Sequence, residues 1–324
     1  MKNVSIFVPE SAVMEAVADP RYLFTAANQF LQASGRPALF EVQLVGQARE
    51  IRLHGGVFSV HVDKVLEEVE RTDLVVIPAL FGDMQAAVEK NRGAIPWLVR
   101  HYNNGAELAS LCVGAFLLAS TGVLNGKKCS THWAYYNEFR AMFPEVEVAD
   151  GSIITEEEGI YSSGGANSYW NLLLYLLEKY TDRDTAILAA KYFAIDIGRD
   201  SQAAFTLFRG QKDHNDEEVK KAQEYMEANY QEKIAVDELA NMVAVSRRSF
   251  ERRFKKATNN TVVEYLQRVK VEAAKRDFEG SRKNISEVMY DVGYTDSKAF
   301  RAVFKKVTGL TPVEYRNKYN KAEI

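Results

Sequence analysis

The stretch Gly293-Tyr-Thr-Asp-Ser-Lys-Ala-Phe-Arg-Ala-Val-Phe-Lys-Lys-Val-Thr-Gly-Leu-Thr-Pro-Val-Glu-Tyr-Arg316 decides the fold of the last third of the chain, because its framework occurs twice. The same pattern lies fifty residues earlier. There, the matching residues are Phe250, Phe254, Lys255, Lys256, Thr258, Val263, Glu264 and Tyr265, which correspond in order to Phe300, Phe304, Lys305, Lys306, Thr308, Val313, Glu314 and Tyr315. A pattern that recurs at a fixed offset usually marks one supersecondary unit per copy. We therefore expect two copies of one small helical motif.

Each copy has the signals of a helix-turn-helix. A short helix (236–242 or 285–292) is followed by a turn and a second helix (247–258 or 297–307). Ser246 and Asp296 are suited to cap the second helices, and Gly293 provides the positive φ that is common after a helix C-terminus. Each second helix has two phenylalanines four residues apart on its core face, which leaves Arg and Lys outside. A long helix over 261–278 would be a rigid spacer between the copies.

Charge is divided unevenly along the chain. The whole sequence has 41 Lys and Arg and 44 Asp and Glu, a net charge of −3. Residues 1–215 have a net charge of −7, whereas residues 246–324 have 19 basic and 10 acidic side chains, a net charge of +9. A basic end suits a polyanion, and an acidic body suits a different partner.

Three features of the sequence indicate the cellular compartment of the protein: its two cysteines, its first residues and the length of its apolar runs. Two cysteines form no disulfide framework, and the first residues do not have the pattern of a signal peptide. No run approaches the roughly eighteen apolar residues that a membrane span needs. We expect a cytoplasmic protein with no membrane partner.

The double unit suits duplex DNA. A recognition helix fits the major groove, and successive groove segments on one face lie about 34 Å apart, so a rigid spacer lets one chain read two of them. Residues from about 220 to 318 resemble the DNA-binding domain of the AraC/XylS family of transcription regulators, and the stretch from 293 to 316 is a near-complete signature of that family. The resemblance implies double-stranded DNA and RNA polymerase as partners.

By position, the resemblance assigns base contacts to Arg248, Glu251 and Arg252 in the first copy, and to Ser297, Lys298 and Arg301 or Ala302 in the second. Phosphate contacts fall on Arg247, Lys255, Lys256, Lys305 and Lys306. Phosphate contacts supply most of the affinity, while a few side chains read base edges. Ala302 is too short for polar readout, so we expect the second copy to read bases less sharply. For each single Arg or Lys, a merely solvated helix face is the alternative.

Residues 1–180 alternate between strand and helix patterns. Apolar or β-branched runs predict strands at 4–8, 40–45, 73–78, 107–111, 153–155 and 160–162. Helical spacing is found at 13–31, 84–103, 113–120, 133–142 and 168–180, and we expect the second of these helices to be broken near Gly93 and Pro96. This alternation is typical of a doubly wound α/β domain, in which helices cover both faces of a parallel sheet.

The sequence Ala109-Ser-Leu-Cys112-Val-Gly114-Ala runs a strand directly into a helix. Gly114 lacks a Cβ where such a turn is tightest, so the pattern predicts a nucleophile elbow that holds Cys112 above the sheet. The start of a helix lowers the pKa of a thiol, and we expect a lowered pKa at Cys112. His132 and Glu15 are the candidate base and carboxylate partner.

Residues 3–180 resemble the PfpI-like branch of the class I glutamine amidotransferase superfamily, with matches at 8–15, 110–119, 122–126, 131–133 and 162–165. The resemblance implies an elbow cysteine in contact with an early acidic residue, roles that fall on Cys112 and Glu15, and a nearby histidine at His132. Val113 stands where several catalytic relatives have histidine, and the loop 78–82 has only Gly82 of the usual paired glycines. We therefore expect a non-catalytic domain without metal or cofactor, whose effector pocket is formed by Glu15, Gly82, Cys112, Val113, His132 and Gly165.

Alternatives stay open at several of these residues. Cys112 could be a catalyst or an inert packing residue, His132 a helix cap, and Glu15 a solvated helix residue. Residues 163–167 could bind an anion through backbone N–H groups or form an ordinary strand–helix turn. The front domain therefore has three candidate functions: a metabolite sensor, a cysteine-dependent amidohydrolase or aldehyde-handling enzyme, and a scaffold that only dimerises.

Together these patterns predict a sensor domain at 1–195, an exposed linker at 196–215 and a DNA-binding domain at 216–324. The expected function is sequence-specific regulation of transcription. Beside DNA and RNA polymerase, we expect a small-molecule effector and a second copy of the chain, paired as a homodimer through the front domain.

Overall fold

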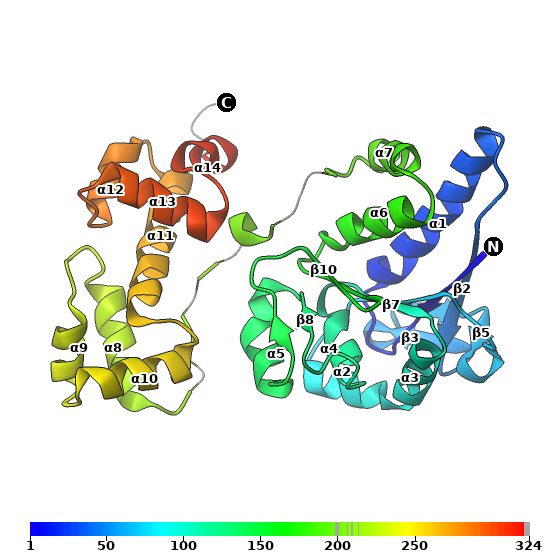
Figure 1. Ribbon diagram of the computed structural model, residues 1–324, viewed down its shortest axis with the longest axis horizontal. Coiled ribbons are helices and arrows are strands. Elements are labelled where there is room, and N and C mark those ends of the chain that lie inside the picture. Colours follow the sequence, from blue (N-terminus) through cyan, green and yellow to red (C-terminus); the bar gives the residue numbers. More distant parts are fainter. Residues whose placement is uncertain (198–200, 206, 209, 213, 321–324) are drawn as a thin grey trace. The chain divides into compact units, whose positions relative to one another are not determined.

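The computed structural model describes residues 1–197, 201–205, 207–208, 210–212 and 214–320. The chain forms two compact units, Met1–Gln202 and Ala203–Ile324, here called the sheet unit and the helical unit (Figure 1). The division falls inside the predicted linker at 196–215. Of that linker, 198–200, 206, 209 and 213 lie outside the described residues, as do 321–324 at the end of the predicted DNA-binding domain.

The sheet unit is built on a seven-stranded sheet with the order β10-β11-β7-β6-β1-β2-β5. These strands are β1 Lys2–Phe7, β2 Phe40–Gly46, β5 Lys64–Val65, β6 Leu74–Ile77, β7 Glu107–Ser110, β10 Ile154–Glu157 and β11 Ile160–Ser163. Every residue of β6 is completely buried, as the unbroken apolar run predicts for a central parallel strand.

Helices cover both faces of this sheet (Figure 1). One face has α1 Met14–Ala33, α6 Tyr169–Tyr180 and α7 Arg183–Tyr192, and the other has α2 Met84–Lys90, α3 Ile95–Asn103, α4 Ala115–Ala119 and α5 Tyr136–Met142. The predicted doubly wound α/β fold is confirmed, including the break between α2 and α3 near Gly93 and Pro96.

Three features of the sheet unit were not anticipated. β10 pairs antiparallel with β11, because Glu158 (φ 51°) and Gly159 (φ 76°) form a tight hairpin turn between them. Two small sheets also form, β3 Glu50–Leu53 with β4 Phe58–His61, and β8 Lys128–Cys129 with β9 Glu147–Val148. Strands of two to four residues are too short to show a periodic pattern.

The helical unit contains two helix-turn-helix copies joined by a long helix (Figure 1). Its helices are α8 Glu217–Ala228, α9 Val236–Met242, α10 Arg247–Thr258, α11 Val262–Gly280, α12 Ile285–Asp291, α13 Ser297–Thr308 and α14 Pro312–Tyr319. Ser246 and Asp296 cap α10 and α13 through their side chains, as predicted. α11 contributes Val269 to the first copy's core and Val271 to the second, so it belongs to both.

β7 passes into α4 through a 3-10 turn at Cys112–Gly114. Cys112 has a φ of 55°, a left-handed conformation that is costly for a residue with a side chain. A Cβ on Gly114 would lie 2.5 Å from the carbonyl oxygen of Pro78 and 2.6 Å from that of Ile77. The elbow therefore packs backbone against backbone at the end of β6.

Gly114→Ala should lower the free energy of unfolding by about 3 kcal/mol, because the carbonyl groups in the way belong to Ile77, the last residue of β6, and to Pro78 directly after it, and backbone groups cannot rotate aside. Gly93→Ala is the matched control, since its Cβ would meet only the end of the Gln47 side chain, which can rotate away. Urea unfolding of both variants measures the difference. Equal stability of the two variants would show that the elbow is not tightly packed.

Candidate functional site

The loops that follow β1, β6, β7 and β11 meet at the carboxyl edge of the sheet. The loop after β1 pairs with the loop after β6: Phe81 N–H donates to the Ser11 carbonyl oxygen (2.6 Å), and Val13 N–H donates to that of Ala79 (2.8 Å). Glu15 follows directly, in the first turn of α1. Of the six predicted pocket residues, Glu15, Gly82, Cys112, Val113 and Gly165 thus come from loops or helix starts at one edge.

Cys112 is enclosed by the strand ends around it. Its N–H donates to Ser163 Oγ (3.3 Å), and its carbonyl oxygen accepts from Thr131 Oγ1 (3.2 Å). The residue is only 5% exposed, and burial raises the pKa of its thiol to about 12. The expected lowering of this pKa is wrong, because removal from water disfavours the thiolate more than the short helix that follows favours it.

Tyr169, at the start of α6, lies near the Cys112 thiol and two carboxylates. Its hydroxyl donates to Asp19 Oδ2 (2.6 Å). Burial and this hydrogen bond raise the pKa of the phenol, and Glu15 and Cys112 lie close enough to raise it further. Tyr169 and Asp19 were missed in the sequence, although Tyr169 directly follows the glycine-rich loop at 163–168. The edge therefore combines a neutral thiol, a phenol and two acidic groups.

His132 is held as a helix cap. Its Nδ1 accepts from Ala134 N–H (3.2 Å), and its ring lies edge-on to Tyr135. Burial lowers the pKa of the imidazole, so the neutral form is favoured. In the described part of the chain no hydrogen bond joins His132 to Cys112. The capping alternative raised from the sequence accounts for this geometry.

The glycine loop after β11 packs around a side chain from the end of the sheet unit. Gln202 is 1% exposed, and its Nε2 donates to the carbonyl oxygens of Ser152 (2.8 Å) and Thr131 (3.1 Å). A Cβ on Gly164 would lie 1.8 Å from that Nε2, and Gly165 (φ 77°) is also close to Gln202. These contacts favour a structural turn at 163–167 over an anion site, and they tie Gln202 to the sheet unit.

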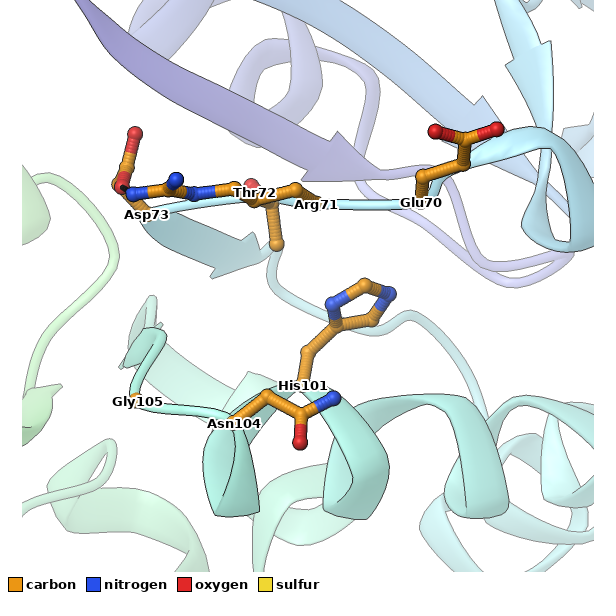
Figure 2. A pocket seen from close by; sticks show the side chains of 7 residues that line it. All are labelled: Glu70, Arg71, Thr72, Asp73, His101, Asn104 and Gly105. Atoms are coloured by element: carbon orange, nitrogen blue, oxygen red, sulfur yellow. Dashed lines mark hydrogen bonds and ion pairs between the residues drawn. The ribbon is translucent and has the colours of Figure 1, made fainter.

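A cavity of about 380 Å³ lies at the opposite, amino edge of the sheet (Figure 2). It is lined by Glu70, Arg71, Thr72, Asp73, His101, Asn104 and Gly105. His101 lies on α3 and points toward the segment that leads into β6, as Figure 2 shows. Its Nε2 is buried without a hydrogen-bond partner among the described residues, and burial lowers its pKa. None of the six predicted pocket residues lines this cavity.

Among the residues that the structure describes, no helix combines the length and the apolar composition of a membrane span. The same residues contain no group of three or more His, Cys, Asp or Glu side chains placed to hold a metal ion.

The outer faces of α10 and α13 carry every residue that the sequence assigns to DNA. Arg248, Glu251, Arg252, Ser297, Lys298 and Arg301 are exposed, and so are Arg247, Lys255, Lys256, Lys305 and Lys306. They are exposed because Phe250, Phe254, Phe300 and Phe304, each at most 1% exposed, fix the opposite faces in the cores. The structure thus leaves both sets accessible to a macromolecular partner.

Ion pairs separate the basic residues of α10 into two kinds. Arg247 pairs with Asp237 (3.0 Å) and Glu251 (3.2 Å) at the surface, where such pairs are weak enough to be exchanged for a phosphate. Arg253 instead holds Asp216 through two nitrogens (2.8 and 2.6 Å) and lowers the pKa of that carboxyl. It anchors α10 to the start of α8, a structural role that its basic neighbours in the sequence conceal.

Comparison with known proteins gives two family matches. Residues 18–179 match the DJ-1/PfpI family, and residues 239–318 match a helix-turn-helix domain family. Similar proteins include the HTH-type transcriptional regulator ArgR of Pseudomonas aeruginosa, 27% identical over 78% of this chain and 74% of the relative. GbdR of the same species, also an HTH-type transcriptional regulator, is 23% identical over 78% and 68%. The crystal structure of Drosophila melanogaster DJ-1beta shares the fold of the sheet unit (TM-score 0.51, 16% identity, 60% of this chain and 98% of that chain).

Both cysteines should react slowly with iodoacetamide in the native protein. Burial raises the pKa of Cys112 and of Cys129 to about 12, so at pH 8 the thiolate is scarce in the folded chain, and alkylation should be at least about 100-fold slower than in urea. Because these folded-state pKa values lie above the unfolded value of about 9, stability should also fall as the pH rises from 9 toward 12. Native alkylation at the unfolded rate would contradict the buried, neutral thiol.

Proposed function

Since the chain belongs to the DJ-1/PfpI family and is a DNA-binding transcription regulator with an AraC-type domain, we propose that the sheet unit senses a metabolite while the helical unit reads two unequal DNA half-sites. One observation carries the proposal: two copies with the same buried framework present different exposed residues. Arg248, Glu251 and Arg252 on α10 become Lys298, Arg301 and Ala302 on α13.

The carboxyl edge of the sheet unit is suited to binding rather than to reaction. A nucleophilic cysteine needs a thiolate and a base, whereas burial keeps Cys112 protonated and His132 Nδ1 is engaged as a cap. Glu15 and Asp19 add negative charge beside the phenol of Tyr169. These groups favour a small metabolite with a cationic or hydrogen-bonding nitrogen, and we propose that it binds at this edge.

Sensing requires that the metabolite bind one state of the regulator better than another. We propose that the bound effector changes how the helical unit engages DNA, and that the sheet unit also pairs two chains into a homodimer. The regulator would work in the cytoplasm, where its DNA and RNA polymerase are found.

A cysteine-dependent enzyme is the second candidate function. The left-handed backbone at Cys112 favours it, because that strained elbow geometry exposes nucleophiles in hydrolases. Cys112→Ala distinguishes the two: loss of a measurable amidohydrolase or aldehyde-consuming activity would support the enzyme, and unchanged regulation without any activity would exclude it.

Arg252→Ala should weaken binding to the selected operator by roughly 1–3 kcal/mol and relax preference at one base pair, if Arg252 reads a base edge. Lys256→Ala is the matched control on the same face of α10, and its loss should be uniform across sequences, as for a phosphate contact. Competition binding against operators mutated at each position measures both. A uniform loss in Arg252→Ala would show that it contacts only the backbone of DNA.

A panel of amine- and carbonyl-containing metabolites should include one that raises the thermal unfolding midpoint, because a ligand at 100 times its Kd stabilises by about 2.7 kcal/mol. Asp19→Asn should weaken this ligand in calorimetry, whereas Glu89→Gln on the surface of α2 should not. If the panel contains no metabolite that binds, in any chemical class, the sensing proposal is refuted. A binder insensitive to Asp19→Asn but lost in His101→Ala would place the effector in the cavity of Figure 2 instead.

A further inference from the structure

The turns of the two helix-turn-helix copies have the same backbone but different residues. In the first, Ala244 has a φ of 53°, and the N–H groups of Ala244 and Val245 donate to the carbonyl oxygens of Asn241 and Ala240 (3.0 and 3.1 Å). In the second, Gly293 has a φ of 73°, and Gly293 and Tyr294 donate in the same way to Tyr290 and Met289 (2.9 and 3.0 Å). Alanine occupies the first turn, so the turn itself does not require glycine.

Gly293 is required by a contact with the first copy. A Cβ there would lie 2.0 Å from the carbonyl oxygen of Gln231, which belongs to the loop between α8 and α9. Tyr230, the preceding residue, packs against the cores of both copies. The turn of the second copy therefore rests on the backbone of the first.

A buried lysine lies in the same contact. Lys270, in the middle of α11, is 7% exposed. Its Nζ donates to the carbonyl oxygens of Val292 (3.0 Å) and Gly293 (3.4 Å) in the second copy, and more weakly to that of Glu232 (3.5 Å) in the first. It also lies over the ring of Tyr294, 5.5 Å from the centroid. These carbonyl oxygens lie at the C-terminus of α12, where the helix dipole attracts an ammonium group, while burial lowers the pKa of Lys270.

We propose that Lys270 and Gly293 are positioning residues that lock the two reading helices at one separation and one rotation, and so set the spacing of the DNA half-sites that the protein accepts. α11 joins the two copies because its residues lie in both cores. The junction at Lys270 and Gly293 adds direct contacts between the two copies, which restrain their relative orientation further. Neither residue needs to touch DNA for this role. One additional base pair between the half-sites moves one half-site by about 3.4 Å and turns it by about 35° relative to the other, so two helices held in one orientation fit only one spacing.

The test uses the full-length protein and the operator obtained by selection from random DNA, with one to five base pairs inserted between the half-sites. In the wild type a single insertion should reduce affinity about tenfold or more, because a rigid pair of helices cannot follow the rotation. In Lys270→Met the best operator should bind more weakly, and the same insertion should cost less than about threefold. Gly293→Ala, which must push the Gln231 carbonyl aside, should shift the preferred spacing or remove the preference.

Two matched controls separate positioning from general loss of stability. Lys275→Met removes another buried lysine of α11, one whose ammonium contacts Glu272 (2.9 Å), and Ala244→Gly alters the equivalent turn of the first copy. Both should keep the wild-type insertion penalty, and circular dichroism at the assay temperature shows which variants are folded. If Lys270→Met does not fold, the insertion penalty and preferred spacing of Gly293→Ala test the proposal instead.

Folded Lys270→Met or Gly293→Ala proteins with the wild-type insertion penalty and spacing would overturn the proposal. So would a wild type that binds two half-sites at every spacing alike. A selection that returns one half-site only would refute the two-site reading on which this inference rests, and that outcome is distinguishable because it precedes the spacing series.

Discussion

Burial of two phenylalanines four residues apart on each reading helix is the constraint on which the helical unit depends. Phe250 and Phe254 on α10, and Phe300 and Phe304 on α13, pack into their cores. Phe254 and Phe304 also pack edge-on against Tyr265 and Tyr315. Each ring removes a large apolar surface from water, so the helix cannot turn about its axis without exposing it. The buried rings therefore determine which of the remaining positions on these helices face the core and which face the solvent.

That constraint explains why the copies can differ in the residues that they expose. The buried framework tolerates little change, whereas the exposed positions are free to vary without loss of stability. Arg252 on α10 becomes Ala302 on α13, whereas Phe250 and Phe254 keep buried phenylalanine counterparts on α13. A repeat of this kind keeps the scaffold and changes the reading face, which suits two DNA half-sites of different sequence.

The sequence predicted the helical unit well because its signals are local. Ser246 and Asp296 cap helices by contacts within three residues, and the phenylalanine spacing defines a face without knowledge of the rest of the chain. The sheet unit was predicted at the level of its layers for the same reason. The environment of Cys112 was not, because Ser163, Thr131 and Tyr169 reach it from distant parts of the chain. The pKa of the Cys112 thiol depends on burial by these residues. The rule that a helix start lowers a thiol pKa uses local sequence only and therefore predicted a shift in the wrong direction. The contact of Gly293 with Gln231 is likewise long-range, although the glycine itself is visible in the sequence.

If one chain reads two unequal half-sites through two copies of one motif, the DNA that it selects should contain both. The decisive experiment is selection of bound sequences from random DNA by the full-length protein. We expect a bound element with two different half-sites, centred about 10–10.5 base pairs apart on one face of the DNA, with stronger base preference in the half contacted by α10. A single half-site, or two identical half-sites of equal strength within one element, would contradict it.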